Sequence, residues 1–446
     1  MRIIARVLGY GSALLGTLTA LRSPHGVGGG IVWLPKLWAQ AWAPMVTIAG
    51  LLGALIGLVR GDRGVVLGGL FGALASLRYT ARVIARHDRF EAAFGPDWQD
   101  RIPTDLRTRM PPSRYRLLQP APPRAVRQAD VTIADREAGR LLLADLWRPP
   151  VDVPPTGLAV VFLHGSLWQA LDKDFLTRPL FQRLAGQGHV ILDLAYPLAP
   201  EADLTSMIVA VRQAVTWLQA HAREYMVRPD RIVLMGASGG GHLALLAAYA
   251  SGDPASATPK SDVPSAPPVP AVRAVVSLYG ITDLAAFFDE YGRTNPGQPR
   301  SSAGITEAMR PRRRDATVID RALTRARVFP AYRHGNMPGG RLLLIDLLGG
   351  TPDEVPEAYR LGSPIAHVRP GCPPTLLVLG DDDFAVDVSH GRRLHAALLE
   401  AGVPSVLVEL RDTVHGFDQY FGVSRRVAPA AQVATYDIER FLALMV

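Results

Sequence analysis

Apolar residues follow two different patterns along the chain. Residues 7–21, 37–59 and 64–77 contain no charged side chain. From residue 129 onward the apolar runs become short and alternate with segments in which apolar residues recur at helical spacing. The runs that are nearly continuous are 158–163, 189–196, 231–236, 271–279, 375–380 and 405–410. The first pattern is typical of membrane helices, and the second is typical of strands in a parallel sheet buried on both faces.

The amino-terminal region, residues 1–80, is predicted to hold two or three transmembrane helices. Only the run 37–59 reaches the roughly 20 residues that a helix needs to cross the hydrocarbon core. Small residues recur one helical turn apart at Gly53 and Gly57, and again at Gly68 and Gly72, which favours close helix packing. Tryptophans suited to a membrane interface lie at or near the start of the central run: Trp33, Trp38 and Trp42.

Two other interpretations of this region stay open. Arg2 and Arg6 before an apolar run are similar to a cleaved secretory signal, although no small-residue cleavage site follows Leu21. Alternatively, the helices are buried in a soluble protein. The orientation in a membrane is open too, because Arg60 and Arg63 favour a cytoplasmic turn while the arginines after residue 77 draw the opposite end inward.

Residues 81–127 are predicted to form an amphipathic helix followed by a proline-rich linker. The net charge of +8 admits an anionic partner. The basic run at 310–314 is interpreted as a solvated helix face, or as a contact for lipid phosphates or an anionic substrate. No nucleic-acid partner is expected, because no aromatic residues interleave with this run. The single cysteine, Cys372, excludes an intramolecular disulfide and a cysteine metal cluster.

The remaining residues, 128–446, are predicted to form an α/β domain with a doubly wound, mostly parallel sheet. A hairpin with its turn at 136–139 precedes the apolar runs and gives the sheet an antiparallel edge. The helical segments that separate or follow the later strands are 204–222, 240–250, 388–401 and 428–445. The stretch near 285–356 is too long for an ordinary connection, so it is predicted to be a helical cap insertion.

A candidate nucleophile stands between a strand and a helix. Ser238 lies in the sequence Gly-Ala-Ser-Gly-Gly, directly after the strand 231–236 and before the helix 240–250. A sharp strand-to-helix turn exposes a serine hydroxyl and leaves room only for very small neighbours two residues away on either side. The motif alone has little weight in a chain with 42 glycines, but its position between strand and helix favours a catalytic serine over an ordinary turn.

The other members of a catalytic triad are expected on loops after later strands, the acid before the histidine. Asp383 follows the strand 375–380, and His415 follows the strand 405–410. Asp381 and Asp382 are the alternative acids, while Asp387 is expected to cap the next helix. The acid would hold the tautomer of the imidazole and stabilise the imidazolium.

An oxyanion site is expected after the strand 158–163. The backbone amides of Gly165 and Ser166, together with the amide of Gly239, are the predicted donors to a developing oxyanion. His164 is expected to order this loop and, together with Trp168, to line the substrate pocket. No metal ligand or cofactor site is required by this chemistry.

With these parts placed, residues 129–445 resemble the α/β-hydrolase superfamily, in its esterase/lipase branch near the hormone-sensitive-lipase-like and isoprenylcysteine-methylesterase-like enzymes. The motifs that carry the resemblance surround His164, Tyr196, Ser238, Tyr279, Ser363, Pro373 and His415. The resemblance implies the triad Ser238, Asp383 and His415, with an oxyanion hole at residues 165–166. Ser166 replaces the second glycine of the family's usual His-Gly-Gly loop, which leaves substrate choice open.

Together these features predict a membrane-anchored serine carboxylic-ester hydrolase that acts on a small-molecule or lipid ester. The alternatives are a peptidase or an acyltransferase with the same triad, and a non-catalytic membrane scaffold. The acyl and alcohol groups, the side of the membrane and the oligomeric state are not determined by the sequence.

Overall fold

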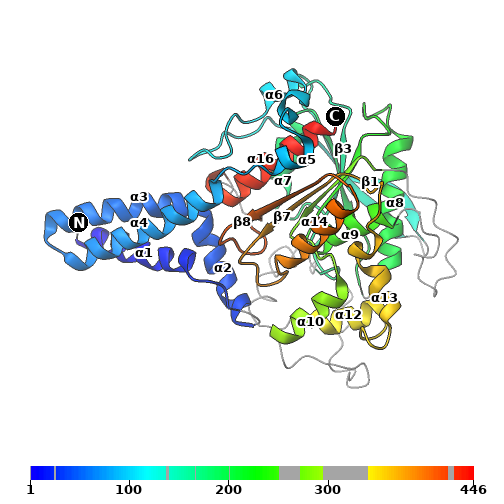
Figure 1. Ribbon diagram of the computed structural model, residues 1–446. Helices are drawn as coiled ribbons and strands as arrows, with labels where there is room; N and C mark the ends of the chain where they lie inside the picture. The colour runs from blue at the N-terminus through cyan, green and yellow to red at the C-terminus, as the bar shows by residue number, and fades with distance from the viewer. Residues whose placement is uncertain are drawn as a thin grey trace.

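The computed structural model describes residues 2–24, 27–136, 140–165, 167–199, 201–250, 272–294, 340–419 and 426–446. A bundle of long helices, which includes the first helix of the chain, projects from one side of an α/β domain (Figure 1). The basic run at 310–314 lies outside the described residues.

One eight-stranded sheet forms the centre of the α/β domain. Its strands lie in the order β1-β2-β4-β3-β5-β6-β7-β8. The pairs β1–β2 and β2–β4 are antiparallel, and all later pairs are parallel. The strands are β1 (Val126–Arg136), β2 (Arg140–Arg148), β3 (Ala159–Leu163), β4 (Val190–Ala195), β5 (Ile232–Ala237), β6 (Ala274–Leu278), β7 (Thr375–Gly380) and β8 (Ser405–Leu410). The predicted mostly parallel sheet with an antiparallel edge is confirmed.

Helices cover both faces of this sheet, because successive side chains of a strand point to opposite faces. In β7, Leu376 and Val378 join one apolar cluster, and Leu377 and Leu379 join the other. The first cluster contains residues of α7 (Arg178–Ala185) and α16 (Pro429–Leu444). The second contains residues of α8 (Leu204–Ala220), α9 (Gly239–Tyr249) and α14 (Ser389–Glu400). Every residue of β3, β5, β6 and β7 is therefore buried.

Helices also occupy the described parts of the predicted cap region. They are α10 (Leu284–Thr294) and α12 (Gly340–Leu348), and α13 (Pro356–Gly362) and the 3-10 helix η6 (Pro364–His367) come directly after them. Phe287, Leu343 and Leu344 are buried in the same cluster as α8 and α9. These helices follow the carboxyl end of β6. The middle of the predicted cap, 295–339, lies outside the described residues.

The segment between the bundle and the sheet is more structured than the predicted linker. It contains α5 (Arg89–Phe94), η1 (Trp98–Arg101) and α6 (Thr104–Arg109). Phe90 is buried and stacks on Trp98 with ring centroids 4.9 Å apart. Leu106 joins the cluster that contains α16. The range of the predicted amphipathic helix and linker thus contains three short helices.

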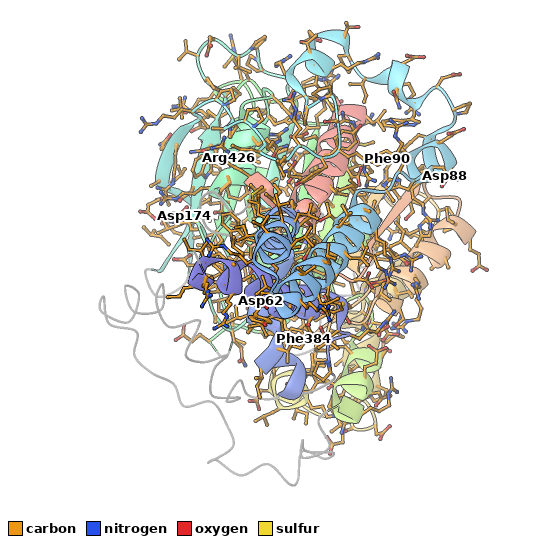
Figure 2. The ribbon with its side chains drawn as sticks, turned by 90° about the vertical axis from the view of Figure 1, so that its left-hand side faces the viewer. Asp62, Asp88, Phe90, Asp174, Phe384 and Arg426 are labelled. Carbon is orange, nitrogen blue, oxygen red and sulfur yellow. The ribbon has the colours of Figure 1, made fainter. Side chains whose placement is uncertain are left out.

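The projecting bundle consists of α1 (Arg2–Ala20), α3 (Ala43–Arg60) and α4 (Arg63–Ile84), and Figure 2 views it along its length with Asp62 labelled at the α3–α4 turn. Glycines allow the three backbones to approach closely. A methyl group on Gly50 would lie 2.5 Å from the Gly69 carbonyl oxygen, and one on Gly72 would lie 2.2 Å from that of Ser12.

The apolar run 37–59 does not form one continuous helix. The structure divides this run between α2 (Val27–Ala41) and α3, with Trp42 between them and Pro44 in the first turn of α3. Proline lacks a backbone N–H and suits a helix start rather than a helix interior. Within the described ranges, three helical stretches are long and apolar enough to cross a membrane: Arg2–Ala20, Ala43–Arg60 and Arg63–Phe94.

Candidate active site

The turn that carries Ser238 has the geometry of a nucleophile elbow. Ser238 lies between the end of β5 and the start of α9, with φ of 53° and ψ of −121°. A positive φ is unusual for a residue with a side chain and marks a strained turn. The Ser238 amide donates to the Leu278 carbonyl at 2.8 Å, which fixes the elbow to β6.

The two glycines beside the elbow are required by close backbone contacts. A methyl group on Gly236 would lie 2.2 Å from the Gly240 carbonyl oxygen. One on Gly240 would lie 2.1 Å from the carbonyl oxygen of Leu163 and 2.4 Å from that of His164. The expected need for very small residues on both sides of Ser238 therefore has a steric cause in the structure.

Gly240→Ala is expected to lower the free energy of unfolding by about 3 kcal/mol, because backbone atoms of β3 must move to admit the methyl group. Urea unfolding and ester hydrolysis, measured on the same preparation, check this expectation. Gly11→Ala is the matched control, since nothing lies within 4 Å of a methyl group there. Equal stability of the two variants would contradict the steric argument.

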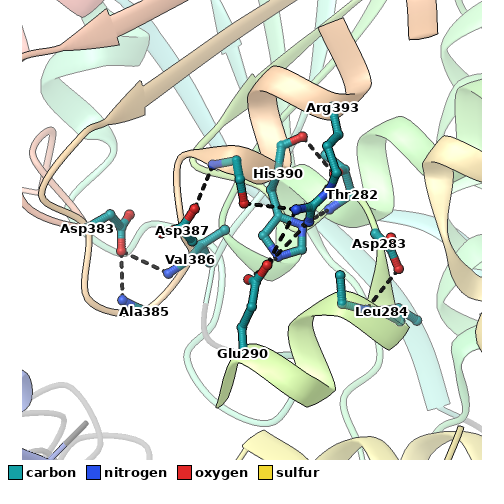
Figure 3. A network of polar contacts seen from close by, with 12 residues as sticks. Thr282, Asp283, Leu284, Glu290, Asp383, Ala385, Val386, Asp387, His390 and Arg393 are labelled. Atoms are coloured by element: carbon teal, nitrogen blue, oxygen red, sulfur yellow. Dashed lines mark hydrogen bonds and ion pairs between the residues drawn. The ribbon is translucent and has the colours of Figure 1, made fainter. Parts of the chain in front are cut away.

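The structure brings Asp383 and His415 into direct contact. The Nδ1 atom of His415 lies 2.7 Å from Oδ2 of Asp383, and the Asp383 carboxylate is inaccessible to solvent. The other carboxylate oxygen accepts hydrogen bonds from the amides of Ala385 at 2.8 Å and Val386 at 2.9 Å (Figure 3). These bonds hold the carboxylate in place beside the imidazole.

The three other aspartates of this loop have different partners. Asp381 accepts from the Asp412 amide and lies 3.2 Å from Arg411 Nη1. Asp382 forms a buried ion pair with Lys36. Asp387, expected to cap α14, lies one residue before the cap position Val388 and accepts from the Ser389 amide at 2.8 Å.

Ser238 is linked to this pair through β6. Tyr279 directly follows Leu278, the residue that accepts from the Ser238 amide, and its ring centroid lies 4.5 Å from that of His415. The Tyr279 hydroxyl donates to Asp418. Among the residues that the structure describes, no hydrogen bond joins Ser238 to His415. Catalytic hydrogen bonds are often long without substrate and tighten in the complex.

The predicted oxyanion residues lie on both sides of Ser238. A methyl group on Gly165 would lie 3.3 Å from Ser238 Cβ, so the loop after β3 passes directly beside the nucleophile. Gly239 begins α9, where backbone N–H groups and the helix dipole favour a negative charge. Ser166, the third predicted donor, lies outside the described residues.

Trp168 is packed against the first residue of α9, and its predicted place in the substrate pocket stays a prediction. Its side chain is fully buried, and its indole N–H donates to the Gly239 carbonyl at 3.0 Å. The ring also meets His242 edge-on at 5.0 Å between centroids. Trp168 therefore supports the start of α9 directly after the nucleophile.

His164 orders the loop beside the elbow. Its Nδ1 lies 2.9 Å from the Gly165 carbonyl, and its ring stacks on Tyr196 with centroids 4.4 Å apart. Burial lowers the pKa of His164 below its usual value. These contacts hold the ring between Gly165 and Tyr196, while the roles of His164 in ordering the loop and lining the pocket stay predictions.

The loop after Gly165 is held in place by one buried carboxyl group, that of Asp193. Burial raises the pKa of Asp193 well above its usual range. Its Oδ2 accepts from the Asp174 amide at 2.6 Å. Several residues of the loop have positive φ angles: Leu167, Trp168, Leu171, Asp174 and Leu176. Polar anchoring at Asp193 therefore maintains a strained loop beside the nucleophile.

A second polar network joins α10 to the helix that follows the acid loop (Figure 3). His390 is fully buried, and its Nε2 lies 3.0 Å from Oε2 of Glu290. The Thr282 hydroxyl donates to the His390 carbonyl at 2.9 Å. His390 is thus a buried link between α10, the connection that precedes α10, and α14.

Sequence reasoning missed three residues that contact the Asp383–His415 loops. Tyr279 was noted only as part of a motif, although its place after a central strand is a signal of a site residue. Trp33 donates to the His415 carbonyl, and Lys36 contacts Asp382. Both lie in α2, whose contact with loops more than 340 residues later has no local sequence signal.

The chain is similar to a known protein family and to named esterases. The family model described as BD-FAE matches residues 144–317, a range that contains the Ser238 elbow but neither the Asp383 loop nor the His415 loop. Esterase LipQ of Mycobacterium tuberculosis is 27% identical over 354 residues, which cover 77% of this chain and 72% of LipQ. Esterase LipC of the same organism is 26% identical over 291 residues, which cover 65% of this chain and 60% of LipC.

A solved structure of an esterase from Pyrobaculum calidifontis has the same fold. The two superpose with a TM-score of 0.50 at 20% identity, and the superposition covers 72% of this chain and 86% of the other. At this identity the likeness concerns the fold alone.

Proposed function

Because this chain belongs to the esterase/lipase branch of the α/β-hydrolase superfamily, we propose that it hydrolyses carboxylic esters with Ser238 as the nucleophile. The observation that carries the proposal is the 2.7 Å contact between His415 Nδ1 and Asp383 Oδ2, at the sheet edge that also presents the Ser238 elbow. A buried carboxylate on Nδ1 leaves Nε2 as the nitrogen that accepts a proton.

The proposed reaction has two halves. Ser238 Oγ attacks the ester carbonyl carbon while His415 Nε2 takes its proton, and the resulting oxyanion accepts from the amides of Gly165 and Gly239 and, as predicted, Ser166. Collapse expels the alcohol, which takes the proton from His415. Water then attacks the acyl-enzyme in the same way and releases the acid and free Ser238.

Hydrolysis of a short p-nitrophenyl ester by the purified full chain tests this function. Turnover that depends on Ser238 supports it, whereas turnover that survives the loss of Ser238 contradicts it. Adding a second alcohol and analysing the products separates hydrolysis from acyl transfer.

We further propose that α1, α3 and α4 anchor the enzyme in a membrane and that its ester is lipophilic. The bundle exposes many large apolar side chains, including Leu14, Leu51, Leu55, Leu58, Leu67 and Leu74, each at least 53% exposed. A surface of this kind is unfavourable in water but suits lipid. The small residues of the helices face one another instead.

The double variant Leu55→Arg/Leu74→Arg is expected to reduce the share of the protein that resists extraction from membranes by alkaline carbonate. Each arginine near the middle of a spanning helix costs about 3 kcal/mol of insertion free energy. Val151→Arg is the matched control, since Val151 is a fully exposed apolar residue of the α/β domain. Equal extraction of both variants would argue against the anchor.

A further inference from the structure

The helix α2 contacts the loop of the candidate catalytic histidine. The Trp33 indole N–H donates to the backbone carbonyl of His415 at 2.6 Å, and Trp33 is only 7% exposed. The Trp33 ring lies 5.9 Å from that of Phe384, which in turn lies 6.4 Å from the His415 ring. A side chain of α2 therefore contacts the backbone of the catalytic histidine directly.

The same helix contacts the loop of the triad acid. Lys36 forms an ion pair with Asp382, the neighbour of Asp383, and is 1% exposed. The amide and the hydroxyl of Ser23, just before α2, donate to Asp382 at 3.0 Å each. Lys36 also donates to the Leu21 carbonyl. The Asp382 carboxylate thus joins the acid loop to the segment that leads into α2.

A third contact lies one turn further along α2. The Gln40 side chain accepts from the Val414 amide at 3.3 Å and donates to the Asp412 carbonyl. Trp33, Lys36 and Gln40 are spaced i, i+3 and i+7, which places them on one face of the helix. That face meets the acid and histidine loops, while Trp38, on a different face, is 40% exposed.

We propose that α2 positions the catalytic dyad, with Trp33 and Lys36 as positioning residues for His415 and Asp383. The inference rests on the proposed function, since it assigns these residues a part in the same reaction. A buried ion pair is weak evidence for stability, because desolvation offsets its attraction, but it selects one geometry. Proton transfer requires such a geometry, since a misplacement of about 1 Å can cost a hundredfold in rate.

The first test compares Trp33→Phe with Trp38→Phe in the purified full chain. Trp33→Phe keeps an aromatic ring and removes the indole N–H. We expect kcat to fall between about tenfold and a hundredfold, with KM changed less than about twofold. The rate of labelling by a fluorophosphonate should fall in parallel, because it also depends on His415. Trp38→Phe should behave as the unaltered protein.

The second test separates positioning from stability at the ion pair. Lys36→Met leaves a buried unpaired carboxylate and should destabilise the protein, whereas Lys36→Met/Asp382→Asn removes both charges and should recover its thermal unfolding midpoint. We expect kcat of the double variant to stay at least about tenfold low. Lys36→Arg, which keeps the pair, should recover part of the rate lost in Lys36→Met.

The outcomes distinguish this inference from the proposed function. Hydrolysis that depends on Ser238, together with unaltered kcat in both Trp33→Phe and the stable double variant, overturns the positioning role alone. Hydrolysis that does not depend on Ser238 overturns the proposed function instead.

Discussion

Ser238→Ala is expected to lower kcat for ester hydrolysis by roughly 10⁴- to 10⁶-fold, the loss seen when the nucleophile of a triad is removed. The variant keeps the fold, because the contact that fixes the elbow runs from the Ser238 backbone amide to Leu278. The amides of Gly165 and Gly239 remain, so a small residual rate over water should persist. Steady-state kinetics with a p-nitrophenyl ester measure this change.

Ser113→Ala serves as the matched control, since Ser113 is exposed and its hydroxyl donates only to the Tyr115 carbonyl at 3.2 Å. Its kcat should equal that of the unaltered protein. If Ser238→Ala retained more than about a hundredth of the original kcat, Ser238 would not be the nucleophile.

Asp383→Asn is expected to lower kcat about 10⁴-fold while leaving the fold intact. The amides of Ala385 and Val386 require an acceptor, so the asparagine oxygen should take the place of Oδ1. The asparagine NH₂ group would then face His415 Nδ1 and force this nitrogen to accept. The proton would move to Nε2, which could no longer receive the proton of Ser238.

Asp387→Asn is the matched change in the same loop. Its oxygen accepts from the Ser389 amide rather than contacting His415, so kcat should change little and stability by about 1 kcal/mol at most. Kinetics of the two variants at one pH decide between the aspartates. A large loss of kcat in Asp387→Asn together with a normal kcat in Asp383→Asn would contradict the assignment of Asp383 as the triad acid.

The sheet could be predicted because its signals are local. The strands β3 to β8 lie within the nearly continuous apolar runs, which is what burial on both faces requires. The Ser238 elbow and the loops of Asp383 and His415 follow from the same pattern, since each stands at the carboxyl end of a strand. The exact acid among the neighbouring aspartates depended on loop geometry that the sequence does not contain.

Contacts between distant segments could not be predicted. Nothing near Trp33 or Lys36 in the sequence indicates that these side chains meet the His415 and Asp383 loops. The break at Trp42 was missed because apolar composition continues across it, although Pro44 was an available signal. The contact of the Trp168 indole with the Gly239 carbonyl likewise has no local sequence signal.

The most direct test of the account is to identify the residue that a fluorophosphonate probe modifies in the full chain. The probe traps a serine that a histidine activates, so peptide mass spectrometry should find the adduct on Ser238, and hydrolysis should stop as labelling becomes complete. An adduct on a different residue, or continued hydrolysis with Ser238 fully labelled, would contradict the account.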